Sequence, residues 1–178
     1  QLNAAAIAPD WVANPERKIP VAALARLLEN SSAAARCEDF GLRHSESIHA
    51  ARLGLLALAV YEEPTVARAL AAATRLTHLH NEAIDLWTEQ SGDDHVVHLE
   101  YLSRTSAAMR QLVEMTMGVL YRNMRKVIGE KWAARAVCFR HSPPQRVAAY
   151  RAVFGTRVDF NCDFDGVICS AADFASKN

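Results

Sequence analysis

Apolar residues in the first half of the chain are spaced with the period of helices. They recur at helical spacing from Pro20, which suits the first turn of a helix, to Asn30. A second helix is expected to start within residues 31–36 and to end before Phe40-Gly41-Leu42, where the glycine permits a turn. Residues 50–60 are apolar nearly all round, which predicts a buried helix or a core-lining segment.

A fourth helix and a β-hairpin are predicted next. Thr65 is a good N-cap, and the apolar stripe that follows, over residues 66–79, has helical spacing. The period then changes to two over residues 84–89 and 97–101, with Gly92 between these segments. This is the pattern of two strands joined by a glycine-containing turn.

The second half begins with the longest predicted helix, over residues 105–128, which spans about 36 Å and ends at Gly129. After it we expect a strand over 136–139, a helix that Pro143 and Pro144 open and Gly155 ends, and short strands over 158–160 and 166–169. The fold class is therefore α+β, with an N-terminal helical half and a small mixed or antiparallel sheet packed against the long central helix.

Length and composition fit one domain. A chain of 178 residues with 51% apolar content can bury a core without disulfides. Residues 1–18 contain an alanine run, two prolines and mixed charge, so we expect them to form a flexible N-terminal arm. Residues 19–175 then form a single domain.

The charge balance argues against a free-standing nucleic-acid binder. The chain has 20 basic and 20 acidic residues, whereas phosphate recognition requires a basic face. A net charge of zero also favours self-association, because little repulsion keeps copies apart.

The cysteines and the apolar runs indicate a cytoplasmic protein without a membrane partner. The four cysteines form no CxxC pair, so we expect reduced thiols, with Cys138, Cys162 and Cys169 as buried strand residues. The longest apolar stretch, residues 53–61, is too short to span a bilayer, and residues 1–13 lack the basic region of a signal peptide.

Motif spacing predicts no metal and no cofactor. Residues 161–166 begin like a calcium-binding EF-hand loop, but Ala172 occupies the twelfth position, where a bidentate Glu is required. His78 and His80 are two apart on a predicted helix and point away from each other.

Local motifs also give no support for catalysis. The chain has no GxSxG, no glycine-rich phosphate loop and no HExxH. We therefore expect no enzymatic activity. An unrecognised enzyme remains an alternative, because catalytic groups can converge from distant positions, and it predicts a cleft with carboxylate, His or Cys groups of perturbed pKa.

Several segments resemble the N-terminal, arabinose-binding-type domain of AraC-type bacterial regulators, nearly from end to end. The segments that carry this resemblance are Ile19-Pro20, Phe40-Gly41-Leu42, Leu53-Gly54-Leu55-Leu56, Pro64 to Leu70, the hairpin near Trp87, Val137 to Pro144, Tyr150 to Gly155, Val158 to Phe160, and Phe164 to Val167. The last third is the most specific part.

The resemblance implies a domain that binds a small-molecule effector and forms homodimers in a bacterial activator or repressor. In this family a C-terminal pair of helix-turn-helix motifs reads DNA, and that domain is absent from these residues. DNA is therefore expected as a partner only through the missing domain. The chain begins without Met, so we expect a piece of a longer protein.

We expect the effector to enter a pocket between the long helix and the sheet. The candidate ligand-binding residues are Trp87, Tyr101, Met117, Tyr121 and Arg140. The aromatic residues offer apolar bodies with a polar handle, Met117 is adaptable, and Arg140 can pair a carboxylate. Core packing or surface ion pairing is the alternative for each. A dimerisation module without a ligand also stays open, and a cavity of a few hundred Å³ would count against it.

Overall fold

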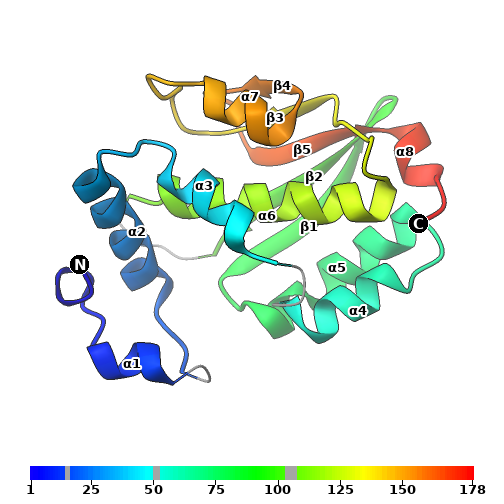
Figure 1. Ribbon diagram of the computed structural model, residues 1–178. Coiled ribbons are helices and arrows are strands. Elements are labelled where there is room, and N and C mark those ends of the chain that lie inside the picture. Colours follow the sequence, from blue (N-terminus) through cyan, green and yellow to red (C-terminus); the bar gives the residue numbers. More distant parts are fainter. Residues whose placement is uncertain (15–16, 50–52, 103–107) are drawn as a thin grey trace.

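The structure, a computed structural model, describes residues 1–14, 17–49, 53–102 and 108–178. Within these ranges the elements are, in chain order, η1 (Asn3–Ala5), α1 (Pro9–Ala13), α2 (Val21–Ala35), α3 (Phe40–Ser47), α4 (Leu55–Tyr61), α5 (Val66–His80), β1 (Ile84–Ser91), β2 (Asp94–Tyr101), α6 (Arg110–Ile128), β3 (Ala136–Cys138), α7 (Ala148–Phe154), β4 (Arg157–Asp159), β5 (Asp165–Ser170) and α8 (Ala171–Ala175). The α+β class predicted from the sequence is confirmed (Figure 1).

The five strands form one mixed sheet with the order β1-β2-β5-β3-β4. The β1–β2 hairpin is antiparallel and turns at Gly92, which has φ +61°. The last strand, β5, pairs antiparallel with both β2 and β3, and β3 pairs parallel with β4. The predicted mixed sheet and hairpin are therefore confirmed, although both hairpin strands are longer than the alternating pattern indicated.

The long helix α6 crosses the sheet in Figure 1 and forms the main core with it. Val97, Val137 and Val167 lie side by side on adjacent strands and are fully buried. They belong to one apolar cluster with Met117 and Tyr121 of α6. The predicted packing of the sheet against a long central helix is thus confirmed.

Residues 21–35 form one helix, whereas the sequence pattern indicated that one helix ends near Asn30 and another starts after it. Helix α2 continues through Asn30 and ends where Arg36 adopts φ +50°, and the Cys37 N–H donates to the Ser32 carbonyl at 3.0 Å. Asn and Ser weaken a helix interior by only a few tenths of a kcal/mol. No glycine or proline interrupts residues 21–35, so the helix continues.

Gly41 lies inside helix α3, so the predicted turn at this position is wrong. A methyl group at Gly41 would lie 1.9 Å from the Gln111 backbone oxygen of α6. The glycine is needed for the close approach of two helices, not for turn geometry. Gly118 on α6 serves the same contact, since a Cβ there would lie 2.3 Å from the Ser45 hydroxyl.

The boundaries of two other predicted helices also differ. The predicted start of the long helix at residue 105 lies outside the described residues, and α6 runs from Arg110 until Gly129 ends it. Helix α7 begins at Ala148 and not at the prolines. Pro144 disfavours the helical conformation at Pro143, which directly precedes it. The predicted cap of α7 at Gly155, with φ +62°, is confirmed.

Helix α4 is not a buried helix, but it lines the core on one side, where Val60 and Tyr61 pack against the main apolar cluster, so the second of the two predicted alternatives fits. The exposed fraction is 83% for Leu55 and 57% for Leu58, whereas Ala57 is buried against the rest of the protein. Helix α8, which was not predicted, is held by a capping box between Ser170 and Asp173.

The N-terminal residues contact the domain through a small apolar cluster. Ala5 and Ile7 are buried against Ala23 of α2, and the Arg26 guanidinium donates to the Ala5 carbonyl at 3.3 Å. These contacts hold the start of the chain beside α2. The flexibility expected for residues 1–18 stays a prediction.

Candidate functional site

An apolar cavity of about 130 Å³ lies between α4, α5, the β1–β2 hairpin and α6. Leu86 and Leu99 form its floor on the sheet, and Leu120 forms the wall on α6. The lining is completed by Leu53, Leu56, Ala57, Val60, Tyr61, Ala73, Thr77, His80, Asn81, Ile84, Thr116, Val119 and Asn123. The predicted position of a pocket, between the long helix and the sheet, matches this cavity.

Several polar side chains in the cavity wall are already hydrogen-bonded within the protein. The Thr77 hydroxyl donates to the Ala73 carbonyl at 2.6 Å, and the Thr116 hydroxyl donates to the Leu112 carbonyl at 2.9 Å. The Asn123 amide donates to the Val119 carbonyl at 2.7 Å, and its oxygen accepts from the Tyr61 hydroxyl. A polar ligand would therefore have to break these bonds to be satisfied, whereas an apolar ligand would not.

The cavity adjoins an apolar groove of about 380 Å³ on the outer side of α4 and α5. Leu53, Leu56 and His80 line both spaces and so form the wall between them. The groove also contains two leucines that are largely exposed, Leu55 at 83% and Leu79 at 74%. The two adjoining spaces together extend from the molecular surface towards the sheet and are mostly lined by apolar side chains.

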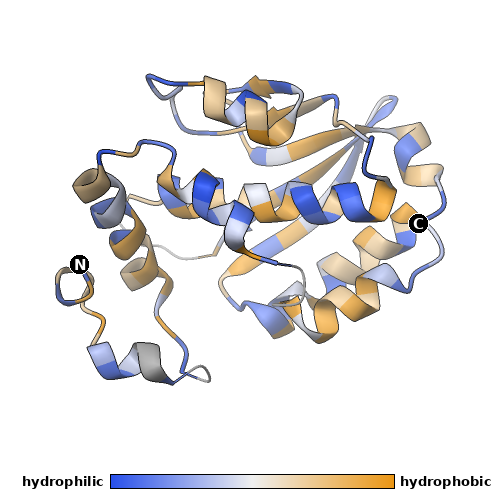
Figure 2. Cartoon of the chain, in the orientation of Figure 1, coloured by the Kyte–Doolittle hydropathy of each residue, from blue (hydrophilic) through white to orange (hydrophobic). Residues whose placement is uncertain are grey.

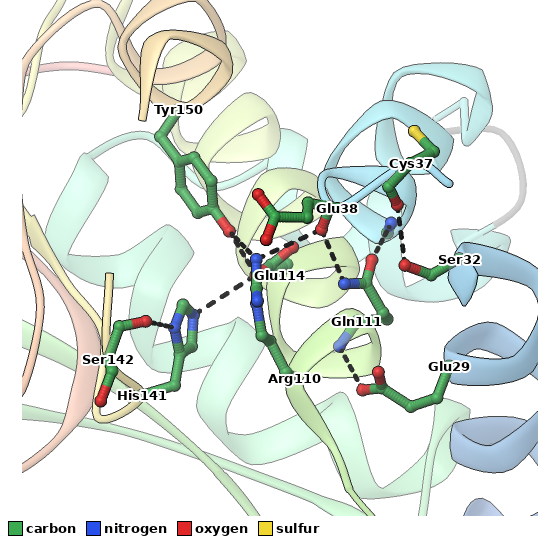
Figure 3. A network of polar contacts seen from close by, with 11 residues as sticks. Glu29, Ser32, Cys37, Glu38, Arg110, Gln111, Glu114, His141, Ser142 and Tyr150 are labelled. Atoms are coloured by element: carbon green, nitrogen blue, oxygen red, sulfur yellow. Dashed lines mark hydrogen bonds and ion pairs between the residues drawn. The ribbon is translucent and has the colours of Figure 1, made fainter. Parts of the chain in front are cut away.

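A buried polar network lies at the beginning of α6 (Figure 3). The Glu114 carboxylate, 0% exposed, accepts hydrogen bonds from the Arg110 guanidinium at 2.6 Å and from the Tyr150 hydroxyl of α7. The His141 Nε2 atom lies 3.5 Å from the same oxygen. The second carboxylate oxygen has no hydrogen-bond partner.

Burial controls the protonation of this network. It raises the pKa of Glu114, and the hydrogen bonds from Tyr150 and Arg110 offset only part of that effect. Burial lowers the pKa of Arg110, but hydrogen bonds to Glu114 and Tyr150 outweigh it, so the pKa is raised. The pKa of His141 is lowered by burial, which keeps its ring neutral near neutral pH.

The network continues from α6 to α2 and α3. The Gln111 side chain accepts from the Gly41 N–H at 2.7 Å and donates to the Glu38 carbonyl at 2.8 Å. The Gln111 N–H donates to the Glu29 carboxylate at 2.9 Å. Three helices and the segment between α2 and α3 are thus joined through the first turns of α6.

The structure does not bring the five predicted ligand-binding residues together. Met117 and Tyr121 are core residues with 0% and 1% exposure. Trp87 lies on the sheet face opposite Leu86 and stacks on His98, with ring centroids 4.7 Å apart. None of these three lines the apolar cavity.

Tyr101 and Arg140 line a different hollow, of about 170 Å³, with Leu99, Glu100, Met109, Val113 and Asp165. The Arg140 guanidinium donates to the Asp163 carbonyl at 2.9 Å and lies 3.4 Å from Glu100. Burial raises the pKa of Tyr101 to about 12. The ligand-binding role of all five residues stays a prediction.

Sequence reasoning missed the residues that line the cavity, although a signal for them exists. Thr116, Val119, Leu120 and Asn123 have the spacing i, i+3, i+4 and i+7, so they form one stripe along α6. Two polar residues within an otherwise apolar stripe indicate that this side of the helix lines a cavity and is not packed throughout against other side chains.

The structure also shows how possible metal ligands and the cysteines are arranged, and how long and apolar the helices are. Within the described residues, no group of three or more His, Cys, Asp or Glu side chains is arranged to hold a metal ion. Cys138 and Cys169 are buried strand residues, as expected, whereas Cys162 is half-buried and lies between β4 and β5. No helix in the described part of the chain is long and apolar enough to cross a membrane.

Comparison with known proteins connects this fold to transcription regulators. The HTH-type transcriptional regulator VirS of Mycobacterium tuberculosis, in strains CDC 1551 / Oshkosh and ATCC 25618 / H37Rv, is 29% identical over 150 residues. The match covers 82% of this chain and 44% of the relative, so the chain spans less than half the length of these relatives.

A solved structure has the same fold. The transcriptional regulator CdpR from Pseudomonas aeruginosa superposes with a TM-score of 0.68 at 16% identity, over 91% of this chain and 58% of that chain. The family model of the arabinose-binding domain of AraC transcription regulators, N-terminal, matches residues 1–178. The resemblance first noted in the sequence is thereby confirmed, and the chain belongs to the family of N-terminal arabinose-binding domains of AraC transcription regulators.

Proposed function

We propose that this domain senses a small, largely apolar molecule that binds in the cavity between α4, α5, the hairpin and α6. The observation that carries the proposal is the cavity wall, in which apolar side chains predominate and Thr77, Thr116 and Asn123 bond within the protein. A sugar would lose the hydrogen bonds of its hydroxyls to water without finding free partners there. The family name therefore does not describe the ligand of this chain.

The effector would act by favouring one arrangement of the helices around the cavity. Helix α6 forms a cavity wall with Thr116, Leu120 and Asn123, and its first turns carry the network that joins α2, α3 and α7. A ligand shifts such an equilibrium only by its different affinity for the two arrangements, typically about 1–3 kcal/mol. In the intact regulator, a separate DNA-binding domain would respond to this shift.

This proposal places the domain in a cytoplasmic, homodimeric regulator that contacts DNA through another domain. Catalysis is not part of it. The network around Glu114 has the converging groups that an enzyme would need, but the carboxylate is fully buried. The matching relatives are transcription regulators, which also favours a sensory role.

Filling the cavity should abolish binding of small apolar probes. Benzene and pentanol are suitable probes, because an engineered apolar cavity of about 150 Å³ in another protein binds benzene. The Ala73→Phe substitution places a ring in the cavity, whereas Ala71→Phe on the same helix is exposed and lines neither the cavity nor the groove. Thermal unfolding with and without probe, confirmed by calorimetry, measures the effect.

In the wild type and in A71F, a probe at about 100 times its Kd should stabilise the fold by about 2.7 kcal/mol. In A73F the stabilisation should vanish. Equal stabilisation of A73F, or no stabilisation of the wild type by either probe, would contradict the proposed site.

An interaction module is the second candidate, favoured by the exposed leucines of α4 and α5. Leu55, Leu58 and Leu79 are more than half exposed, and such residues close together are typical of a protein interface. Sedimentation equilibrium of the wild type and of Leu58→Ser separates the two roles. A dimer that dissociates in L58S, in a protein that binds none of the probes, would favour the interaction module.

A further inference from the structure

We propose that the effector is an amphiphile with an alkyl chain. The chain fills the cavity and continues along the groove between α4 and α5, and the polar end group remains in solvent. This inference rests on the proposed function and names the ligand class of the same site. The inference is based on the volume of the cavity, on the residues that the cavity shares with the groove, and on the positions of the exposed polar groups.

The cavity alone is too small for a typical effector. Its volume of about 130 Å³ is slightly below that of an engineered cavity that binds benzene, about 150 Å³. Small-molecule sites usually measure about 300–1,000 Å³. A ligand of ordinary size must therefore extend beyond the cavity, and the groove of about 380 Å³ is the adjoining apolar space.

The boundary between the two spaces is mostly apolar. Leu53 and Leu56 face both the cavity and the groove, with His80 beside them. A flexible alkyl chain can pass between leucine side chains with less rearrangement than a broad ring system requires.

Covering the apolar side chains of the groove is energetically favourable. Leu55 and Leu79, on opposite sides of the groove, are among the most exposed large apolar residues of the described chain. Figure 2 shows hydrophobic residues along both α4 and α5. Each methylene that covers such surface contributes to binding, so affinity should rise with chain length.

The exposed histidines at the groove end of these two spaces offer polar groups to a ligand. Several polar side chains inside the cavity are hydrogen-bonded within the protein, whereas His80 is exposed at the groove and His78 is exposed nearby on α5. The polar end of the ligand is therefore outside. The shared chemistry is the alkyl chain, which occurs in fatty acids and in fatty alcohols.

The test is a chain-length series measured by isothermal calorimetry on the wild-type domain. Linear alcohols from butanol to decanol are titrated, and alkanoates of the same lengths form a second series. We expect saturable binding of one molecule, with Kd falling about fourfold for each added methylene. The fall should continue beyond hexanol, whose chain is about as large as the cavity can hold.

Two variants test whether the fall in Kd beyond hexanol arises from contacts with the groove. In the double variant Leu55→Ser, Leu79→Ser, Kd for butanol should be unchanged, whereas the gain beyond hexanol should be lost. Leu58→Ser is the matched control, because Leu58 is exposed on the same helix but lines neither space. In L58S the whole series should follow the wild type.

The outcomes separate this inference from the proposed function. If benzene and butanol bind but Kd stops falling after hexanol, the alkyl-chain inference is wrong and the apolar cavity site stands. If no alcohol and no apolar probe binds, both are wrong. A chain-length dependence that is present in the alcohols but absent in the alkanoates would also overturn the inference, because the polar end group would then not remain in solvent.

Discussion

Replacement of Gly41 by alanine is expected to lower the free energy of unfolding by about 3 kcal/mol. Helix propensity alone predicts the opposite sign, a gain of about 1 kcal/mol for Gly→Ala in a helix interior. The contact between α3 and α6 reverses it, because the new methyl would lie 1.9 Å from the Gln111 backbone oxygen. The helices must separate, which also strains the hydrogen bond from the Gly41 N–H to the Gln111 side chain. Urea denaturation monitored by circular dichroism measures the change.

The matched control is Glu46→Ala, an exposed position of the same helix. It changes helix propensity without entering the contact, so the free energy of unfolding should change by less than about 0.5 kcal/mol. If G41A proved as stable as E46A, the close approach of α3 to α6 would not be a property of the folded protein.

Removal of the cation beside Glu114 should cost about 3–5 kcal/mol near neutral pH. In Arg110→Met the fully buried carboxylate loses its ion-pair partner, and the remaining donor from Tyr150 does not compensate for its charge. Arg43→Met is the control, since Arg43 and Asp39 are also four residues apart on a helix but the arginine is 68% exposed. Because this arginine is largely in solvent, its removal should cost about 0–1 kcal/mol.

The cost of R110M should depend on pH in a defined direction. Burial already raises the pKa of Glu114 above its value in the unfolded chain, and loss of Arg110 raises it further. A group of this kind stabilises the fold below its unfolded pKa, and the contribution is lost as pH rises through its folded pKa. R110M should therefore be most destabilised at alkaline pH and recover on acidification, in urea titrations at matched ionic strength. A difference from the wild type that does not change with pH would mean that Glu114 does not carry the charge in question.

Local sequence patterns predicted those elements whose signals are local. The hairpin followed from the change to period two and from Gly92, and the end of α6 followed from Gly129. The predictions were wrong where contacts between residues far apart in the sequence determine the local structure. Gly41 was interpreted as a turn because its partner, Gln111, is 70 residues away in the chain.

The candidate site was harder to predict than the fold. Aromatic residues, a methionine and an arginine were predicted to line the pocket. Met117 and Tyr121 instead pack in the core, and Trp87 lies on another face of the sheet. The cavity is instead lined by aliphatic residues that resemble core in the sequence. Whether an apolar residue faces a packed neighbour or an empty space depends on how helices meet, which periodicity does not specify.

The position of β5 in the sheet has a consequence for how this domain is made. Strand β5, Asp165–Ser170, joins the β1–β2 hairpin to the β3–β4 pair, and it is translated after both. Until it leaves the ribosome, β2 and β3 each present an unpaired edge, and the two sheet fragments have no hydrogen bonds between them. Cooperative folding of the nascent chain must therefore wait for its last strand, and during that interval the exposed edges are open to chaperones or to another nascent copy.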